Sequence, residues 1–199
     1  MQAGGEDVAR AHLAELGALV ASVDVAALER LGRCLREVRE RGGTVFVAGN
    51  GGSAATATHF AADLGKATKA RHGMRLRAVS LNTNESWLTA LSNDEGYERS
   101  IAGQLENFIT ENDLLVLISA SGNSPNLLAA VEEAERHGAS TAALLGFDGG
   151  QLKQRVNDHV HVATEQGEYE LVEDVHSAAC HVLVKTLAAD EGAGPEEKS

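Results

Sequence analysis

Aromatic residues, prolines and cysteines are scarce in this 199-residue chain. Aromatic side chains make up only 4% of it, so the core must be aliphatic and rich in alanine, as in parallel sheets covered by helices. The two cysteines, Cys34 and Cys180, show no CxxC spacing. With no signal peptide or transmembrane run expected, this pattern favours a reducing cytoplasm.

Positive charge is also in short supply, with 17 Lys and Arg against 29 Asp and Glu and a net charge of −12. Nucleic acids and anionic membranes need basic patches, so neither is an expected partner. A bound phosphate would have to be held by local dipoles and hydroxyl groups against an unfavourable overall field. The length suits one domain that buries its own core.

The stretch 44–63, TVFVAGNGGSAATATHFAAD, is where a small-molecule site is expected. Its first four residues predict a short buried strand, the run Gly49–Ser53 breaks that strand, and an Ala/Thr-rich helix follows. A helix N-terminus after a glycine turn presents free backbone N–H groups to an anion. Glycine also lets the backbone approach a ligand closely.

A second loop repeats this arrangement after the apolar run 114–118. The sequence SASGNS follows, and Pro125 stands at the first-turn position of the next helix. Serine hydroxyls and helix N-terminal N–H groups suit a phosphate monoester without a lysine. Neither GxxxxGK[ST] nor GxGxxG spacing is present, which disfavours binding of a nucleoside triphosphate or a dinucleotide. Turn chemistry alone would also explain the glycines, but two such loops favour a phosphate site.

The order of elements predicts an α/β fold. Five strands separated by helices imply right-handed crossovers and a parallel sheet covered on both faces, with both loops at one edge. A leading helical pair should bury its outer apolar face against another subunit. The strands are expected at 44–47, 76–81, 114–118, 141–145 and 159–163, and the leading helices at 6–20 and 24–41, with Asp24 as a cap.

Two groups of imidazoles and carboxylates could bind a divalent metal such as zinc. His59 and Asp63 share a helix face, and Glu173 and His181 lie on the last helix. Either group could equally be an ordinary polar surface. Eight residues of helix span about 12 Å, so Glu173 and His181 reach one metal only if Glu173 lies at a frayed helix start or one residue comes from a neighbouring chain.

The segments GNGGSAATATHFAADL, LTALSNDEGYE, ISASGNSPNLL, LLGFDGG and VEDVHSAACH resemble the sugar isomerase (SIS) domain, and most of all the phosphoheptose isomerases. The resemblance covers nearly the whole chain. It implies a flavodoxin-like αβα sandwich and a homotetramer with active sites at subunit interfaces. It also implies zinc-assisted interconversion of sedoheptulose 7-phosphate and an aldoheptose 7-phosphate in heptose biosynthesis. We expect one SIS domain over 1–189, with leading helices to 42 and an α/β core from 43, and a disordered tail over 190–199.

Carried over residue by residue, the resemblance assigns metal binding to His59, Asp63, Glu173 and His181. Asp63 stands where the family has glutamate, and Glu173 where it has glutamine. Substrate contacts, to which we add Glu173, fall on Asn50, Gly51, Gly52, Ser53, Asn93, Asp94, Ser119, Ala120, Ser121 and Ser124.

Isomerisation through an enediolate needs a base, an acid and a cation for the developing oxyanion. We expect Asp63 as the base and His181 as the acid, with Glu173 able to take either role. The alternative is a non-catalytic SIS-domain sensor or adaptor that binds a sugar phosphate. The retained histidines and carboxylates favour the enzyme.

Overall fold

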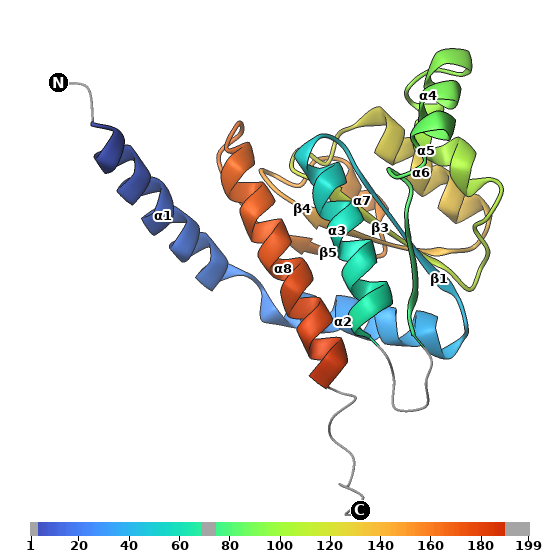
Figure 1. Cartoon of the computed structure of the whole chain (residues 1–199), viewed down its shortest axis with the longest axis horizontal. Helices are drawn as coiled ribbons and strands as arrows, with labels where there is room; N and C mark the ends of the chain where they lie inside the picture. The colour runs from blue at the N-terminus through green and yellow to red at the C-terminus, as the bar shows by residue number, and fades with distance from the viewer. Residues whose placement is uncertain (1–3, 69–74, 190–199) are drawn as a thin grey trace, which may run out of the picture.

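The computed structural model describes residues 4–68 and 75–189, which form a five-stranded parallel sheet flanked by helices (Figure 1). The strand order is β2-β1-β3-β4-β5, and every neighbouring pair is parallel. This confirms the predicted α/β class. The strands are β1 (Thr44–Gly49), β2 (Arg77–Ser80), β3 (Leu114–Ser119), β4 (Ser140–Leu145) and β5 (Asp158–His161).

The helices begin and end close to the predicted positions. Asp24 accepts hydrogen bonds from the N–H groups of Ala26 and Ala27, as a helix cap should, and Pro125 opens its helix. The sequence also predicts a basic turn over 66–72, of which 69–72 lie outside the described residues, and the tail expected over 190–199 lies outside them entirely. The helices are α1 (Gly5–Ser22), α2 (Val25–Glu40), α3 (Gly52–Ala67), α4 (Glu85–Asp94), α5 (Arg99–Leu105), α6 (Pro125–Arg136), α7 (Leu152–Arg155) and α8 (Tyr169–Ala189).

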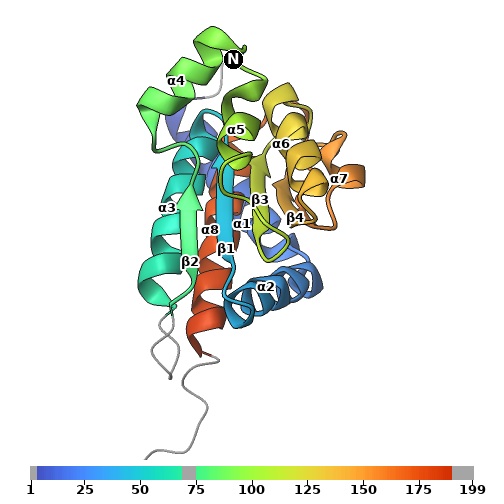
Figure 2. The ribbon, with the colours of Figure 1, turned by 90° about the vertical axis from the view of Figure 1, so that its right-hand side faces the viewer.

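The sheet divides the core into two layers because successive strand residues point to opposite faces. Val45 and Val47 of β1 pack with α2, α3 and α8, whereas Phe46 and Ala48 pack with α5, α6 and α7. The central strand β3 is buried along its whole length. This three-layer arrangement matches the predicted αβα sandwich (Figure 2).

The chain reverses direction across the sheet at β1. From β1 it crosses first to β2 on one side and then to β3 on the other, so the β1–β3 pair is the switch point. Ligands of open parallel sheets bind outside the carboxyl ends of strands at such a point. Both glycine/serine loops leave these two strands there, as predicted.

Helix α1 projects from the body of the fold, and the element that it contacts most is α8 (Figure 1). It has no buried residue, and Val8 and Leu13 are exposed. An apolar groove of about 260 Å³ runs between the α1–α2 junction and α8.

Among the described residues no single helix is long and apolar enough to cross a membrane. Helices α1 and α2 reach the necessary length and apolar composition only when taken together, and they are bent by 64° relative to each other.

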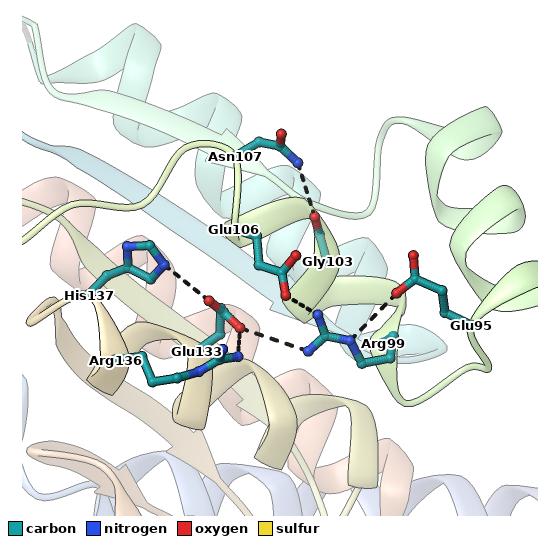
Figure 3. A network of polar contacts seen from close by, with 8 residues as sticks. All are labelled: Glu95, Arg99, Gly103, Glu106, Asn107, Glu133, Arg136 and His137. Carbon is teal, nitrogen blue, oxygen red and sulfur yellow. Dashed lines mark hydrogen bonds and ion pairs between the residues drawn. The ribbon is translucent and has the colours of Figure 1, made fainter.

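A polar network ties α5 to α6 on the sheet face opposite α3 and α8 (Figure 3). At its centre is Glu133 of α6, whose side chain is buried and pairs with Arg136, His137 and Arg99. Arg99 also pairs with Glu106 within its own segment. Charge pairing of a buried carboxylate offsets its desolvation, so the network fixes the position of α5.

Candidate active site

The switch point holds a pocket of about 280 Å³ at the carboxyl ends of β1 and β3. Its walls come from the two predicted loops and from the start of α8. Nine of the eleven predicted substrate-binding positions therefore converge, although the loops are far apart in sequence. The lining residues are Asn50, Gly51, Gly52, Ser53, Ile118, Ser119, Ala120, Ser121, Ser124, Tyr169 and Glu173.

The loop after β1 is fixed by its own geometry and by one asparagine. Gly51 has a φ of +55°, a left-handed conformation that glycine accepts easily, and this turn lets α3 begin at the pocket. The side chain of Asn50 exchanges two hydrogen bonds of 2.9 Å with Asn126 of α6. Its Oδ1 atom also accepts a 2.7 Å hydrogen bond from Tyr97, just before α5. Contacts from α6 and from the segment before α5 thereby hold the Asn50 side chain at the pocket.

The loop after β3 supplies hydroxyl groups. Ser119 and Ser121 accept hydrogen bonds at Oγ from the backbone N–H groups of Gly122 and Asn123, at 3.0 and 3.3 Å. Their hydroxyl protons are left to donate elsewhere. Ser124 precedes α6 as its N-cap residue, and its side chain makes no cap hydrogen bond. A phosphate in this pocket would meet three hydroxyl groups and two helix N-termini.

Glu173 adds an acidic wall from the second turn of α8, over the start of α3. Burial, and then the charges of Glu170 and Asp174, raise the pKa of Glu173 above its usual range. A carboxyl group with a raised pKa takes up and returns protons more readily near neutral pH. Among the described residues that line the pocket, Glu173 alone carries a carboxyl group.

His59, Asp63 and His181 form a second cluster further along α3 and α8. The Nε2 atoms of His59 and His181 lie 3.3 and 3.8 Å from Oδ2 of Asp63. The two rings meet edge to face at 5.1 Å. One ligand atom from each residue lies within 4.8 Å of the others, so the three could hold a metal ion.

Glu173 does not join this group within one chain. It lies in continuous helix, eight residues before His181, so the frayed start considered from the sequence is not what the structure has. Asn93 and Asp94 also stay apart: they end α4, hydrogen-bond to each other at 2.8 Å and do not line the pocket. Their roles in metal and substrate binding stay predictions.

Sequence reasoning missed Tyr97, Asn126, Ile118 and Tyr169. Tyr97 and Asn126 hold Asn50 from distant segments, which a local pattern does not reveal. Ile118 lines the pocket as the end of an apolar strand. Tyr169 carried a usable signal, because it precedes Glu173 by four residues and so shares its helix face.

This fold and this pocket define an SIS-domain protein, and the SIS-domain family model matches residues 11–146. The chain is 36% identical over 167 residues to a probable phosphoheptose isomerase of Thermoplasma volcanium, covering 83% of both. It is 41% identical over 148 residues to the phosphoheptose isomerase of Helicobacter pylori strain HPAG1, covering 74% of this chain and 75% of that one.

The structure of phosphoheptose isomerase GmhA from Neisseria gonorrhoeae matches with a TM-score of 0.83 at 30% identity, covering 92% of this chain and 98% of that one. The chain therefore belongs to the phosphoheptose isomerase family, and it is an isomerase.

Proposed function

We propose that the protein interconverts sedoheptulose 7-phosphate and an aldoheptose 7-phosphate in heptose biosynthesis. The observation that carries this proposal is the alignment of the pocket and the His59–Asp63–His181 cluster along the same two helices, α3 and α8. The names of the relatives support the substrate class. A sugar phosphate needs an anion site at one end and acid–base groups at the other.

The phosphate is placed at Ser119, Ser121 and Ser124, where hydroxyl donors and helix N-termini meet. From Gly52 to His59 the helix rises about 10 Å, a length comparable to an extended seven-carbon chain. The carbonyl end of the sugar would then reach toward Asp63. Glu173 lies between the two ends and is placed against the hydroxyl groups of the chain.

The reaction moves one proton between C1 and C2 and one between their oxygens. Asp63 takes the carbon-bound proton from C1 of the ketose and returns it to C2. His181 transfers the proton that O2 gains and O1 loses. Nε2 of His181 lies 3.8 Å from Oδ2 of Asp63, so the two groups can perform these transfers side by side, without water. Glu173, with its raised pKa, binds the sugar hydroxyls and can relay protons.

The donor set of the cluster fits zinc or a similar divalent ion. Two imidazoles and one carboxylate, with ligand atoms within 4.8 Å of one another, are donors that such ions accept. When bound there, the ion would stabilise negative charge on the sugar oxygens. Glu173 of a neighbouring chain would be the fourth ligand of the predicted set, and Asp63, with its short side chain, would have to release the ion in order to act as the base.

The predicted homotetramer, with sites at subunit interfaces, is also part of this proposal. The exposed apolar residues of α1 and the groove beside α8 support it, because an apolar helix without buried contacts gains by packing on another subunit. We also propose that residues 1–189 form one domain, with leading helices to 42 and an α/β core from 43. A cytoplasmic location is a further proposal, supported by the free Cys34 and Cys180.

Incubation with a panel of ketose phosphates of five to eight carbons, followed by NMR of the C2 epimers, tests the function. The expected result is turnover of sedoheptulose 7-phosphate above the other sugars, and the spectrum also gives the product configuration. Tight binding without turnover of any ketose phosphate would contradict the proposed isomerisation and favour a non-catalytic sugar-phosphate-binding protein.

A further inference from the structure

Tyr169, the first residue of α8, forms a wall of the substrate pocket for which the proposed reaction gives no role. It stands one helical turn before Glu173, so both side chains project from one helix face. Its side chain is about half exposed, at 51%. An aromatic ring with a free face is able to exclude or to contact a ligand.

The ring of Tyr169 is held by Phe147, from the loop after β4. The two rings meet edge to face, with centroids 5.1 Å apart and planes at 77°. Phe147 itself is buried, beside Ala120 and Val172. This is a favourable aromatic geometry, so moving the tyrosine ring aside loses a specific contact as well as apolar area.

The backbone of Phe147 is fixed in turn. Its φ is +45°, a conformation that a residue with a side chain adopts only when its surroundings hold it. His161 is 3.0 Å through Nε2 from the Phe147 carbonyl oxygen, and Nζ of Lys153 lies 3.1 Å from Nδ1 of His161. An imidazole that donates at Nε2 accepts from the lysine at Nδ1, so both contacts are satisfied together.

This aromatic pair stands between two cavities. Tyr169 lines the substrate pocket, whereas Phe147 lines a neighbouring polar cavity of about 230 Å³. Ser121 lines both, so the cavities meet at the proposed phosphate site. The other residues of the second cavity are Asn123, Asp148, Thr164 and Gln166.

We propose that the Phe147–Tyr169 pair is a specificity wall that ends the pocket beyond the phosphate and restricts the site to phosphate monoesters. The inference rests on the proposed phosphate position at Ser121. A phosphodiester continues past the phosphate, and its second ester group would have to pass the tyrosine ring into the polar cavity. The wall therefore rejects phosphodiesters by exclusion.

Calorimetric binding of glycerol 3-phosphate and of glycerophosphoglycerol to the full chain tests the wall. The wild-type protein should prefer the monoester. Tyr169→Ala should reduce that preference by about tenfold, mainly through tighter diester binding, and Tyr169→Phe should keep it. Phe147→Leu, which keeps apolar packing but frees the tyrosine ring, should give an intermediate ratio.

Phe108→Ala is the matched control. Phe108 is 54% exposed and packs edge to face on Trp87 at 5.6 Å, but neither ring lines the pocket. An unchanged ratio in Tyr169→Ala, or an equal fall in Phe108→Ala, would overturn the wall. A changed ratio in a protein that turns over no ketose phosphate would support the wall while the isomerase assignment fails.

Discussion

The carboxylate of Glu173 occupies the space that a side chain at residue 52 would need. An ideal Cβ atom built on Gly52 would lie 2.1 Å from Oε2 and 2.4 Å from Oε1 of Glu173. Real Cβ atoms do not approach other atoms this closely. The absent side chain of Gly52 therefore lets the acidic wall of the pocket close over α3.

Gly52→Ala should displace Glu173 without unfolding the protein, because the obstructing atoms belong to the end of a flexible side chain. Displacement of about 1 Å at a reacting site can cost roughly 100-fold in rate, and we expect kcat/KM to fall by about that factor. Thermal unfolding should change little. Gly65→Ala is the control, since nothing lies within 4 Å of a Cβ at that position of α3. Full activity in Gly52→Ala would show that Glu173 has no part in the reaction.

The phosphate site predicts a loss of affinity on removing single hydroxyl groups. Ser121→Ala and Ser124→Ala should each weaken phosphate-ester binding by about 1.5–3 kcal/mol, the value of a hydrogen bond to a charged acceptor. Titration calorimetry with a sugar phosphate measures this. Wild-type affinity in both variants would remove the phosphate from this loop.

The metal proposal predicts that chelation abolishes isomerisation while the circular dichroism spectrum stays native, and that Zn²⁺ restores activity. His59→Ala should lose both metal and turnover, because it removes one of the two imidazoles of the cluster. Asp63→Asn should keep much of the metal, since the amide oxygen remains a ligand atom, yet lose turnover with the base. Metal-free protein, checked by elemental analysis, that works at the full rate would contradict the metal role.

Because His176 is buried, we expect the folded protein to lose stability at acid pH. It is fully buried on α8, and neither ring nitrogen has a hydrogen-bond partner among the described residues. Burial lowers its pKa to about 4 from 6.5, and the nearby Leu145 backbone offsets this only in part. The unfolded chain thus binds a proton at a higher pH than the folded protein does. The resulting loss of stability should begin below pH 6.5 and reach about 3 kcal/mol near pH 4.

Replacing His176 with leucine removes this proton-linked loss. Urea unfolding at pH 7 and pH 4.5 should therefore show a smaller difference for His176→Leu than for the wild-type protein. The comparison uses the change with pH, so a general packing defect in the variant cancels. Equal pH dependence in the two proteins would show that other groups cause acid unfolding.

Assembly through α1 can be measured directly. Leu13→Asp places a charge on an exposed apolar position of a helix that has no buried residue in the single chain. Burial of an unpaired charge is costly, so the variant should sediment as a smaller species than the wild-type protein at micromolar concentration. A wild-type protein that is monomeric and fully active would contradict the oligomer.

Much of the pocket could be predicted because it depends on local signals and one topological rule. Small residues after two apolar strands indicated loops at strand ends, and parallel sheets place such ends at one edge. The serine loop with Ser119 and Ser124 was located in this way, whereas Asn50 was assigned through the resemblance to the family. The helix rise also indicated correctly that Glu173 and His181 lie too far apart for one metal within a regular helix.

The remaining features depend on contacts between distant segments. Asn50 is oriented by Tyr97 and Asn126, and no spacing in the sequence pairs these residues. Tyr169 gains its position from Phe147, whose left-handed backbone depends on His161. Such geometry arises from tertiary packing, which overrides what each segment would adopt alone.

Because the pocket lies between β1 and β3, its ability to bind a ligand indicates whether these two strands have paired. Val45 pairs with Leu114, which arrives only after β2, α4 and α5 have been traversed. Closing so long a loop is entropically costly and slows the formation of non-local sheets. The two halves of the phosphate cradle therefore meet only when this central pairing forms. A sugar phosphate added during refolding should bind and trap molecules in which β1 and β3 have already paired. The bound ligand should then slow the global unfolding of these molecules.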